Sequence, residues 1–129
     1  MATSWTVGCD AADPQTLAAF WAAALGDVLE PGFDGPDNAS IIDPGGHAPA
    51  IGFLRVPEGK TAKNRVHLDV RVTEGRAPGE HEQLIRTEVG RLVDLGATAV
   101  REERYDDGPG DVLGHVVMSD PEGNEFCVA

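Results

Sequence analysis

The C-terminal residues 120–128, which read DPEGNEFCV, are the stretch from which the fold of this chain can be built outward. Asp-Pro-Glu-Gly is a composition typical of a tight turn, and the residues after it alternate between polar and apolar side chains. Successive side chains of a strand point to opposite faces. The pattern therefore predicts a closing strand that packs Phe126 and Val128 on one face and presents Glu125 and Cys127 on the other.

A second alternating stretch lies upstream at residues 64–72, with the sequence NRVHLDVRV. It predicts another strand with one apolar and one polar face. The apolar face would carry Val66, Leu68, Val70 and Val72, and the polar face His67, Asp69 and Arg71. In both stretches the face opposite the apolar residues carries side chains that can bind a ligand.

The composition is that of a soluble globular protein. The 129 residues are enough for one domain with a hydrophobic core, and hydrophobic and charged residues make up 41% and 25% of the chain. The net charge of −12 argues against nucleic acid and anionic membranes as partners, because both attract basic surfaces. The chain has no long apolar run and no signal-like N-terminus, so we expect a cytoplasmic protein.

The two cysteines are too few for a disulfide framework. Alternation along the strands places Cys9 on the same face as Trp5 and Val7, and Cys127 on the same face as Glu125. The two thiols are therefore expected on opposite sides of the sheet, which argues against an intramolecular bridge.

Two amphipathic helices are predicted. The first begins at Asp13-Pro14, a helix cap followed by proline, and ends at Gly26. The second covers about residues 79–95 and ends at Gly96. The residues expected to pack these helices onto sheets are Leu17, Phe20, Trp21, Leu25, Ile85, Val89 and Leu92, with Ala24 and Val93 on the same stripes.

The order strand, helix, three strands occurs twice along the chain. The first module covers about residues 1–58, and three of its four strands fall at 5–10, 39–42 and 50–56. The second covers about residues 63–129, with further strands at 98–102 and 115–118 and an acidic loop at 105–111. We expect one α+β domain over residues 1–129, in which two paired βαβββ modules form an open, cup-shaped mixed β-sheet barrel with the helices on its convex side.

With this duplication, the chain resembles the vicinal oxygen chelate superfamily, which contains glyoxalases, bleomycin-resistance proteins and dioxygenases. The resemblance covers nearly the whole chain. It rests on the doubled module, the first helix FWAAALG at residues 20–26, the strand RVHLDV at 65–70 and the turn DPEGN at 120–124. The chain is most similar to small glyoxalase-like proteins of high-GC bacteria.

The resemblance implies four cavity-facing ligand positions, which in metal-dependent members carry His or Glu. In this chain they fall on Thr6, Leu54, His67 and Cys127. His67 matches, Cys127 can bind metal as a thiolate, and Thr6 and Leu54 are non-ligands. We therefore expect no tightly bound cofactor. A divalent metal that did bind would use His67 and Cys127, and this thiolate–imidazole pair would favour zinc.

Two more residues are expected to line the cavity. Glu125 shares a face with Cys127, and it is the candidate catalytic residue and a possible third metal ligand. Asp69 reaches in from the neighbouring strand. The loss of ligands at Thr6 and Leu54 argues against glyoxalase I activity, so whether the chain is an enzyme stays open.

Three functions remain open at this point. The chain is either a binder of a small molecule in the concave cavity, a metal-dependent lyase or isomerase using His67, Glu125 and Cys127, or an interaction domain with a vestigial cavity. The resemblance also implies a homodimer, because related proteins often pair and open sheets have edges that need covering.

Overall fold

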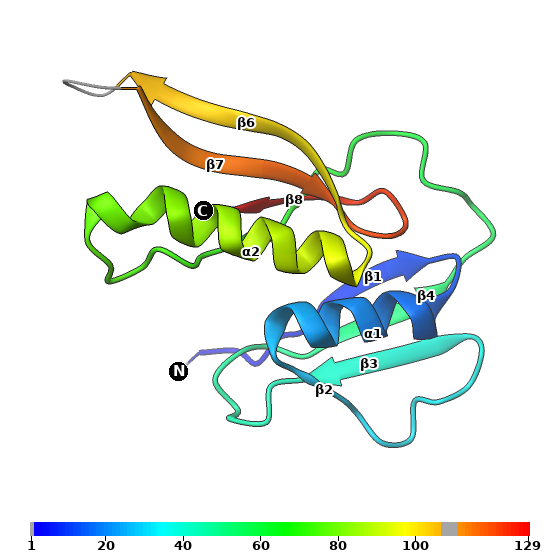
Figure 1. Ribbon diagram of the computed structural model, residues 1–129. Helices are drawn as coiled ribbons and strands as arrows, with labels where there is room; N and C mark the ends of the chain where they lie inside the picture. The colour runs from blue at the N-terminus through cyan, green and yellow to red at the C-terminus, as the bar shows by residue number, and fades with distance from the viewer. Residues whose placement is uncertain (1, 107–110) are drawn as a thin grey trace. The chain divides into compact units, whose positions relative to one another are not determined.

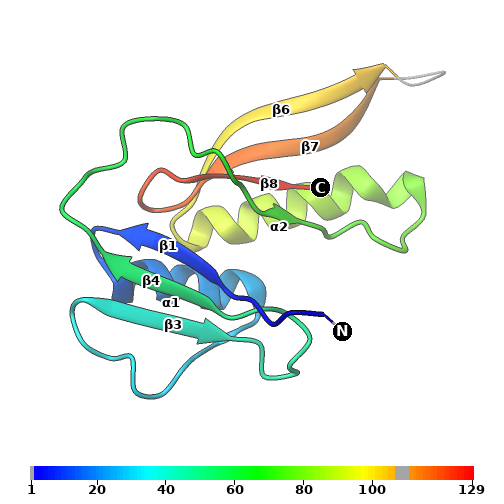
Figure 2. The same cartoon turned by 180° about the vertical axis from the view of Figure 1, so that it is seen from behind.

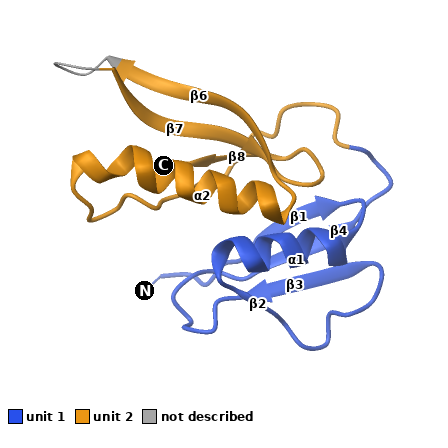
Figure 3. Ribbon diagram, viewed as in Figure 1, with its two compact units in different colours: residues 1–59 blue, residues 60–129 orange. Residues whose placement is uncertain are grey.

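The chain folds into two compact units, residues 1–59 and 60–129, which Figure 3 shows in different colours. The computed structural model describes residues 2–106 and 111–129. Unit 1 contains β1 (Val7–Ala11), α1 (Pro14–Leu25), β2 (Val28–Leu29), β3 (Asn38–Ile42) and β4 (Ile51–Arg55). Unit 2 contains β5 (Asp69–Val70), a 3₁₀ turn (Pro78–Glu80), α2 (His81–Leu95), β6 (Thr98–Asp106), β7 (Asp111–Ser119) and β8 (Glu125–Val128).

Each unit is a βαβββ module, which confirms the predicted α+β class. The strand orders are β1-β4-β3-β2 and β5-β8-β7-β6. In both sheets the first strand pairs in parallel with the last, and the other neighbours are antiparallel. The described strands form two separate sheets, not closed into one barrel. The predicted cup concerns how these sheets face each other, and it stays a prediction.

Helix α1 begins and ends where the sequence predicts. The Asp13 carboxylate accepts hydrogen bonds from the Thr16 hydroxyl at 2.7 Å and from the Thr16 amide at 3.2 Å, and these bonds lower the pKa of Asp13. Gly26 ends the helix with φ at +75°, a conformation that costs glycine little.

In unit 1 the helix covers one face of the sheet and leaves the other open. Figures 1 and 2 show α1 in front of β1, β4 and β3 in one view and behind them in the opposite view. Ile41, Ile51 and Phe53 are buried, whereas Leu54 on the other face of β4 is 55% exposed. This one-sided burial is the source of the alternating pattern in the strands.

Unit 2 follows the same plan. Ile85 and Leu92 are buried on α2, and Phe126 and Val128 are buried on β8, as their alternation predicts. Glu125 and Cys127 are half-buried on the opposite face. The helix therefore packs on one face of this sheet, and its polar face stays accessible.

Three residues predicted to pack are instead exposed. Leu25 is 37% exposed because it is the last residue of α1, where the chain leaves the sheet at Gly26. Val93 is 44% exposed, one position beyond the buried Leu92. Val66 is 81% exposed, because it precedes the paired part of β5.

The strand predicted at 64–72 is mostly irregular, and this prediction was wrong in length. Backbone hydrogen bonds join Leu68 and Val70 to β8, from Cys127 N to Leu68 O at 3.0 Å and from Ala129 N to Val70 O at 2.9 Å. Further upstream the Asn64 side chain replaces the backbone ladder. Its Oδ1 accepts from Glu125 N at 2.8 Å, and its Nδ2 donates to Glu125 O at 3.1 Å.

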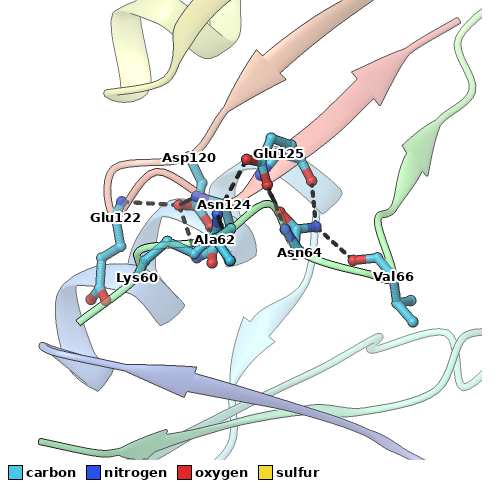
Figure 4. A network of polar contacts seen from close by, with 8 residues as sticks. All are labelled: Lys60, Ala62, Asn64, Val66, Asp120, Glu122, Asn124 and Glu125. Carbon is cyan, nitrogen blue, oxygen red and sulfur yellow. Dashed lines mark hydrogen bonds and ion pairs between the residues drawn. The ribbon is translucent and has the colours of Figure 1, made fainter. Parts of the chain in front are cut away.

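Figure 4 shows the network of hydrogen bonds between residues 60–66 and residues 120–125, which we call the clasp around Asn64. Asp120, which is 3% exposed, accepts hydrogen bonds from Glu122 N and Asn124 N at 2.9 and 3.0 Å. The turn predicted at 120–123 is thus fixed by its own aspartate.

Strands β6 and β7 are both longer than predicted. Tyr105 belongs to β6 and Asp111 to β7, so the ends of the predicted loop are strand residues. The remainder of that loop, residues 107–110, lies outside the described residues. Within the described ranges, neither α1 nor α2 is long and apolar enough to cross a membrane.

Two leucines of α2 provide a matched test of the core. Leu92 is fully buried and Leu95 is 39% exposed. We expect Leu92→Ala to lower the free energy of unfolding by about 2–5 kcal/mol and Leu95→Ala by much less, because only the first leaves a cavity. Urea denaturation followed by circular dichroism measures both. Equal losses in the two variants would contradict the assigned helix face.

Candidate functional site

The open face of the second sheet contains a cavity of about 540 Å³. Its size is within the range of small-molecule sites. The polar and charged residues that line it are Lys63, His67, Asp69, Arg71, Arg101, Tyr105, His115, Glu125 and Cys127. All of them belong to unit 2.

The strand register fixes how the floor of this cavity is laid out. Asp69 on β5 pairs with Cys127 on β8, Cys127 pairs with Val117 on β7, and Val117 pairs with Arg101 on β6. Paired residues of neighbouring strands project from the same face. The four side chains therefore form one row across the sheet, with the Asp69 carboxylate at one end, the Cys127 thiol next to it and the Arg101 guanidinium at the other end.

Three potential metal ligands converge at one end of this row. Ligand atoms of His67, Asp69 and Cys127 all lie within 4.8 Å of one another. His67 Nδ1 is 3.2 Å from Asp69 Oδ1. His67 and Asp69 are exposed and Cys127 is half-buried, so a ligand can reach the group from solvent. The structure thus brings together the predicted pair His67 and Cys127, with Asp69 beside them.

The pKa of the Cys127 thiol is raised. Its burial is the largest cause, and the negative charge of Asp69 adds to it, while the positive charges of Arg101 and Lys63 act in the opposite direction. A raised pKa keeps the thiol protonated at neutral pH. Cys127 is therefore a weak nucleophile on its own and becomes a strong ligand once a cation displaces its proton.

Glu125 lines the same cavity, but its carboxylate is engaged. Oε2 accepts from Asn64 N at 3.1 Å, and Oε1 accepts from Lys60 Nζ at 3.1 Å (Figure 4). These interactions, with the Asn64 amide as the largest cause, lower the pKa of Glu125. Glu125 is thus held as an ionised, hydrogen-bonded group next to the donor cluster.

The donor set of His67, Asp69 and Cys127 fits a zinc ion in kind and number. Zinc in proteins is commonly bound by imidazole nitrogen, carboxylate oxygen and thiolate sulfur. A catalytic zinc ion typically has three protein ligands. When bound, such an ion supplies Lewis-acid polarisation of a ligand oxygen.

The far wall of the cavity contains a pair that the sequence analysis did not identify. The Tyr105 hydroxyl and His115 Nδ1 are 2.8 Å apart. The Tyr105 ring lies over Gly114, where an added Cβ would be 1.8 Å from a ring carbon. Any side chain at Gly114 would displace this ring. The sequence signal that could have identified His115 is the strand period of two. It places His115 on the same face as Val117, opposite the buried Val116.

Thr6 and Leu54 belong to unit 1, where they line a cavity of about 570 Å³ on the open face of the first sheet. The four positions implied by the family resemblance are therefore divided between the units, two in each. Cys9 and Cys127 are likewise in different units, and no disulfide joins them.

Comparison with known proteins agrees with this architecture. The sequence profile of the glyoxalase-like domain matches residues 6–129. No curated protein sequence is significantly similar to the chain.

Solved structures share the fold at low sequence identity. A glyoxalase/bleomycin resistance protein/dioxygenase family enzyme from Burkholderia phytofirmans is 19% identical, with a TM-score of 0.67 over 95% of this chain and 94% of that one. A possible glyoxalase from Bacillus cereus is 16% identical, with a TM-score of 0.66 over 99% and 98%. The fosfomycin resistance protein FosX from Listeria monocytogenes is 11% identical, with a TM-score of 0.68 over 99% and 90%.

These likenesses extend over nearly the whole chain, as does the profile match. Together with the repeated βαβββ topology, they show that the chain belongs to the glyoxalase-like domain family within the vicinal oxygen chelate superfamily.

Proposed function

We propose that the protein binds a small molecule in the cavity on the open face of its second unit. The observation that carries this proposal is the convergence of His67, Asp69 and Cys127 in a cavity of about 540 Å³. Polar groups that converge in a concave pocket fix the orientation of a bound ligand and give it specificity. A vestigial cavity in an interaction domain would need no such gathering.

A second candidate function is metal-dependent catalysis, and one observation favours it. The three donor atoms lie close enough to share an ion, with Asp69 as the third ligand. Glu125, whose carboxylate is held by Lys60 and Asn64, would then act beside the ion and not as one of its ligands. Three ligands leave a coordination position for a substrate oxygen, as lyase and isomerase chemistry requires.

The binding proposal is tested by locating where ligands bind. We expect compounds from a mixed library of neutral, cationic and anionic fragments to shift the backbone amide NMR signals of Asp69, His115 and Cys127. These residues line the cavity, and a bound fragment changes their surroundings. Fragments that bind only at other residues, or a library without any binder, would defeat the proposal.

Zinc titration separates the two possible third ligands. In untagged protein we expect weak zinc binding that His67→Ala abolishes and Asp69→Asn weakens by about tenfold or more, because each removes a donor. Glu125→Gln should retain most of the affinity, and His47→Ala, outside the cavity, is the matched histidine control. Calorimetry measures all four. An equal loss in Glu125→Gln and Asp69→Asn would contradict the ligand assignment.

The affinity for zinc should also depend on pH in a defined direction. The pKa of Cys127 is raised, so its thiol keeps its proton at neutral pH and the ion must compete with that proton. Affinity should therefore rise as the pH increases toward the raised pKa. Replacing Cys127 by alanine should lower the affinity and flatten this dependence. A profile that is unchanged in Cys127→Ala would show that the thiol is not a ligand.

A further inference from the structure

The charged groups that line the cavity of unit 2 are not equally engaged. Two side-chain carboxylates line it, and both have partners. Asp69 lies 3.2 Å from His67 Nδ1, and Glu125 accepts from Lys60 and from the Asn64 amide. The charge of Glu125 is thus compensated by Lys60, and Asp69 already has a side-chain partner in His67.

Of the three cationic side chains that line the cavity, only Arg101 has a carboxylate partner among the described residues. Arg101 is paired with Glu103, its Nε lying 2.5 Å from Glu103 Oε1. Lys63 and Arg71 also line the cavity, and neither makes a hydrogen bond or an ion pair with any residue that the structure describes. Among the described residues, these two positive charges therefore have no partner and can meet a ligand.

The positions of these two cations suit one small ligand. Arg71 follows Asp69 by two residues, so the backbone pairing of β5 with β8 directs it to the same face. Lys63 is near enough to Cys127 that its positive charge acts to lower the pKa of that thiol. Both cations therefore line the same cavity as the Asp69–Cys127 pair.

The excess of acidic residues in the chain makes two unpaired cations in one cavity unusual. The chain has ten lysines and arginines against 22 aspartates and glutamates, and most arginines outside the cavity are paired with carboxylates. In so acidic a protein, an unpaired lysine and an unpaired arginine in one hollow are the natural counter-charges for an anion. Arginine binds carboxylate and phosphonate groups through two parallel hydrogen bonds.

We infer that the ligand of this cavity is a small organic anion, with a carboxylate or phosphonate group held by Arg71 and Lys63. The inference rests on the proposed function, because it names the chemical class of the molecule that would occupy the same cavity. The Tyr105–His115 pair on the far wall would contact the rest of such a ligand.

The test compares probes of one shape and different charge. Benzoate and phenylphosphonate are the anions, and benzamide is the neutral counterpart of benzoate. In NMR titrations we expect both anions to shift the amide signals of Arg71 and Cys127, with benzamide binding at least tenfold more weakly. Arg71→Gln and Lys63→Gln should each weaken benzoate binding by about tenfold, because each removes a charge-assisted hydrogen bond.

Arg65→Gln is the matched control. Arg65 is exposed and belongs to the same segment but does not line the cavity, so its loss should leave benzoate affinity unchanged. Retained dispersion of the NMR spectrum shows that each variant is folded, and the Lys63 variant carries the test if the Arg71 variant does not fold.

Three outcomes would overturn the inference. Benzamide binding as tightly as benzoate would remove the charge requirement, and the cavity would still be a ligand site. Benzoate binding that survives both substitutions would place the anion elsewhere. Failure of both anions, while neutral fragments bind in the cavity, would refute the anion class and leave the proposed function standing. Failure of every fragment in the mixed library would refute both.

Discussion

The parallel pairing of β5 with β8 is the constraint on which the rest of the second unit depends. It joins segments that are far apart in the sequence and places Asp69 directly opposite Cys127. A parallel pair needs a crossover connection, and here α2, β6 and β7 all lie between the two paired strands. The crossover also supplies the helix that covers one face, and the donors that this pairing brings together lie on the opposite face.

One-sided burial then decides what the open face can contain. Phe126 and Val128 fill the helix side of β8, and the period of two leaves Glu125 and Cys127 on the other side. Polar groups there cost little desolvation, because solvent or a ligand can satisfy them. The face can therefore carry imidazole, carboxylate, thiol and guanidinium groups without destabilising the core, and the stability of the unit and the chemistry of its cavity are largely separate.

The parts of this structure that were predictable from sequence are those governed by local pattern. The caps at Asp13 and Gly26 and the alternation of β8 follow from side-chain chemistry and strand period alone. The segment at 64–72 has an equally regular alternation, but only two of its residues form a strand. Its pattern could not show that the Asn64 side chain would take over the hydrogen bonds of a backbone ladder.

Register was the second limit on prediction. The pair Tyr105 and His115 depends on two irregularities in the pairing of β6 with β7, one between Ala99 and Arg101 and the other between Glu103 and Arg104. Each irregularity changes which side chains share a face. The contact of the Tyr105 ring with Gly114 needs this three-dimensional register, because a glycine in a strand pattern does not by itself show which ring will cover it.

The clasp around Asn64 also decides which carboxylate is available to a metal. Sequence parity places Glu125 and Cys127 on one face and makes Glu125 the natural third ligand. The Asn64 amide and Lys60 hold that carboxylate and lower its pKa, so a metal would have to break both interactions to use it. Among the described residues, the Asp69 carboxylate contacts His67 at 3.2 Å and Cys127 through a side-chain hydrogen bond, and both residues are themselves ligand candidates. An ion held by His67, Asp69 and Cys127 would replace contacts among its own ligands, whereas an ion held by Glu125 would have to break the contacts with Lys60 and Asn64.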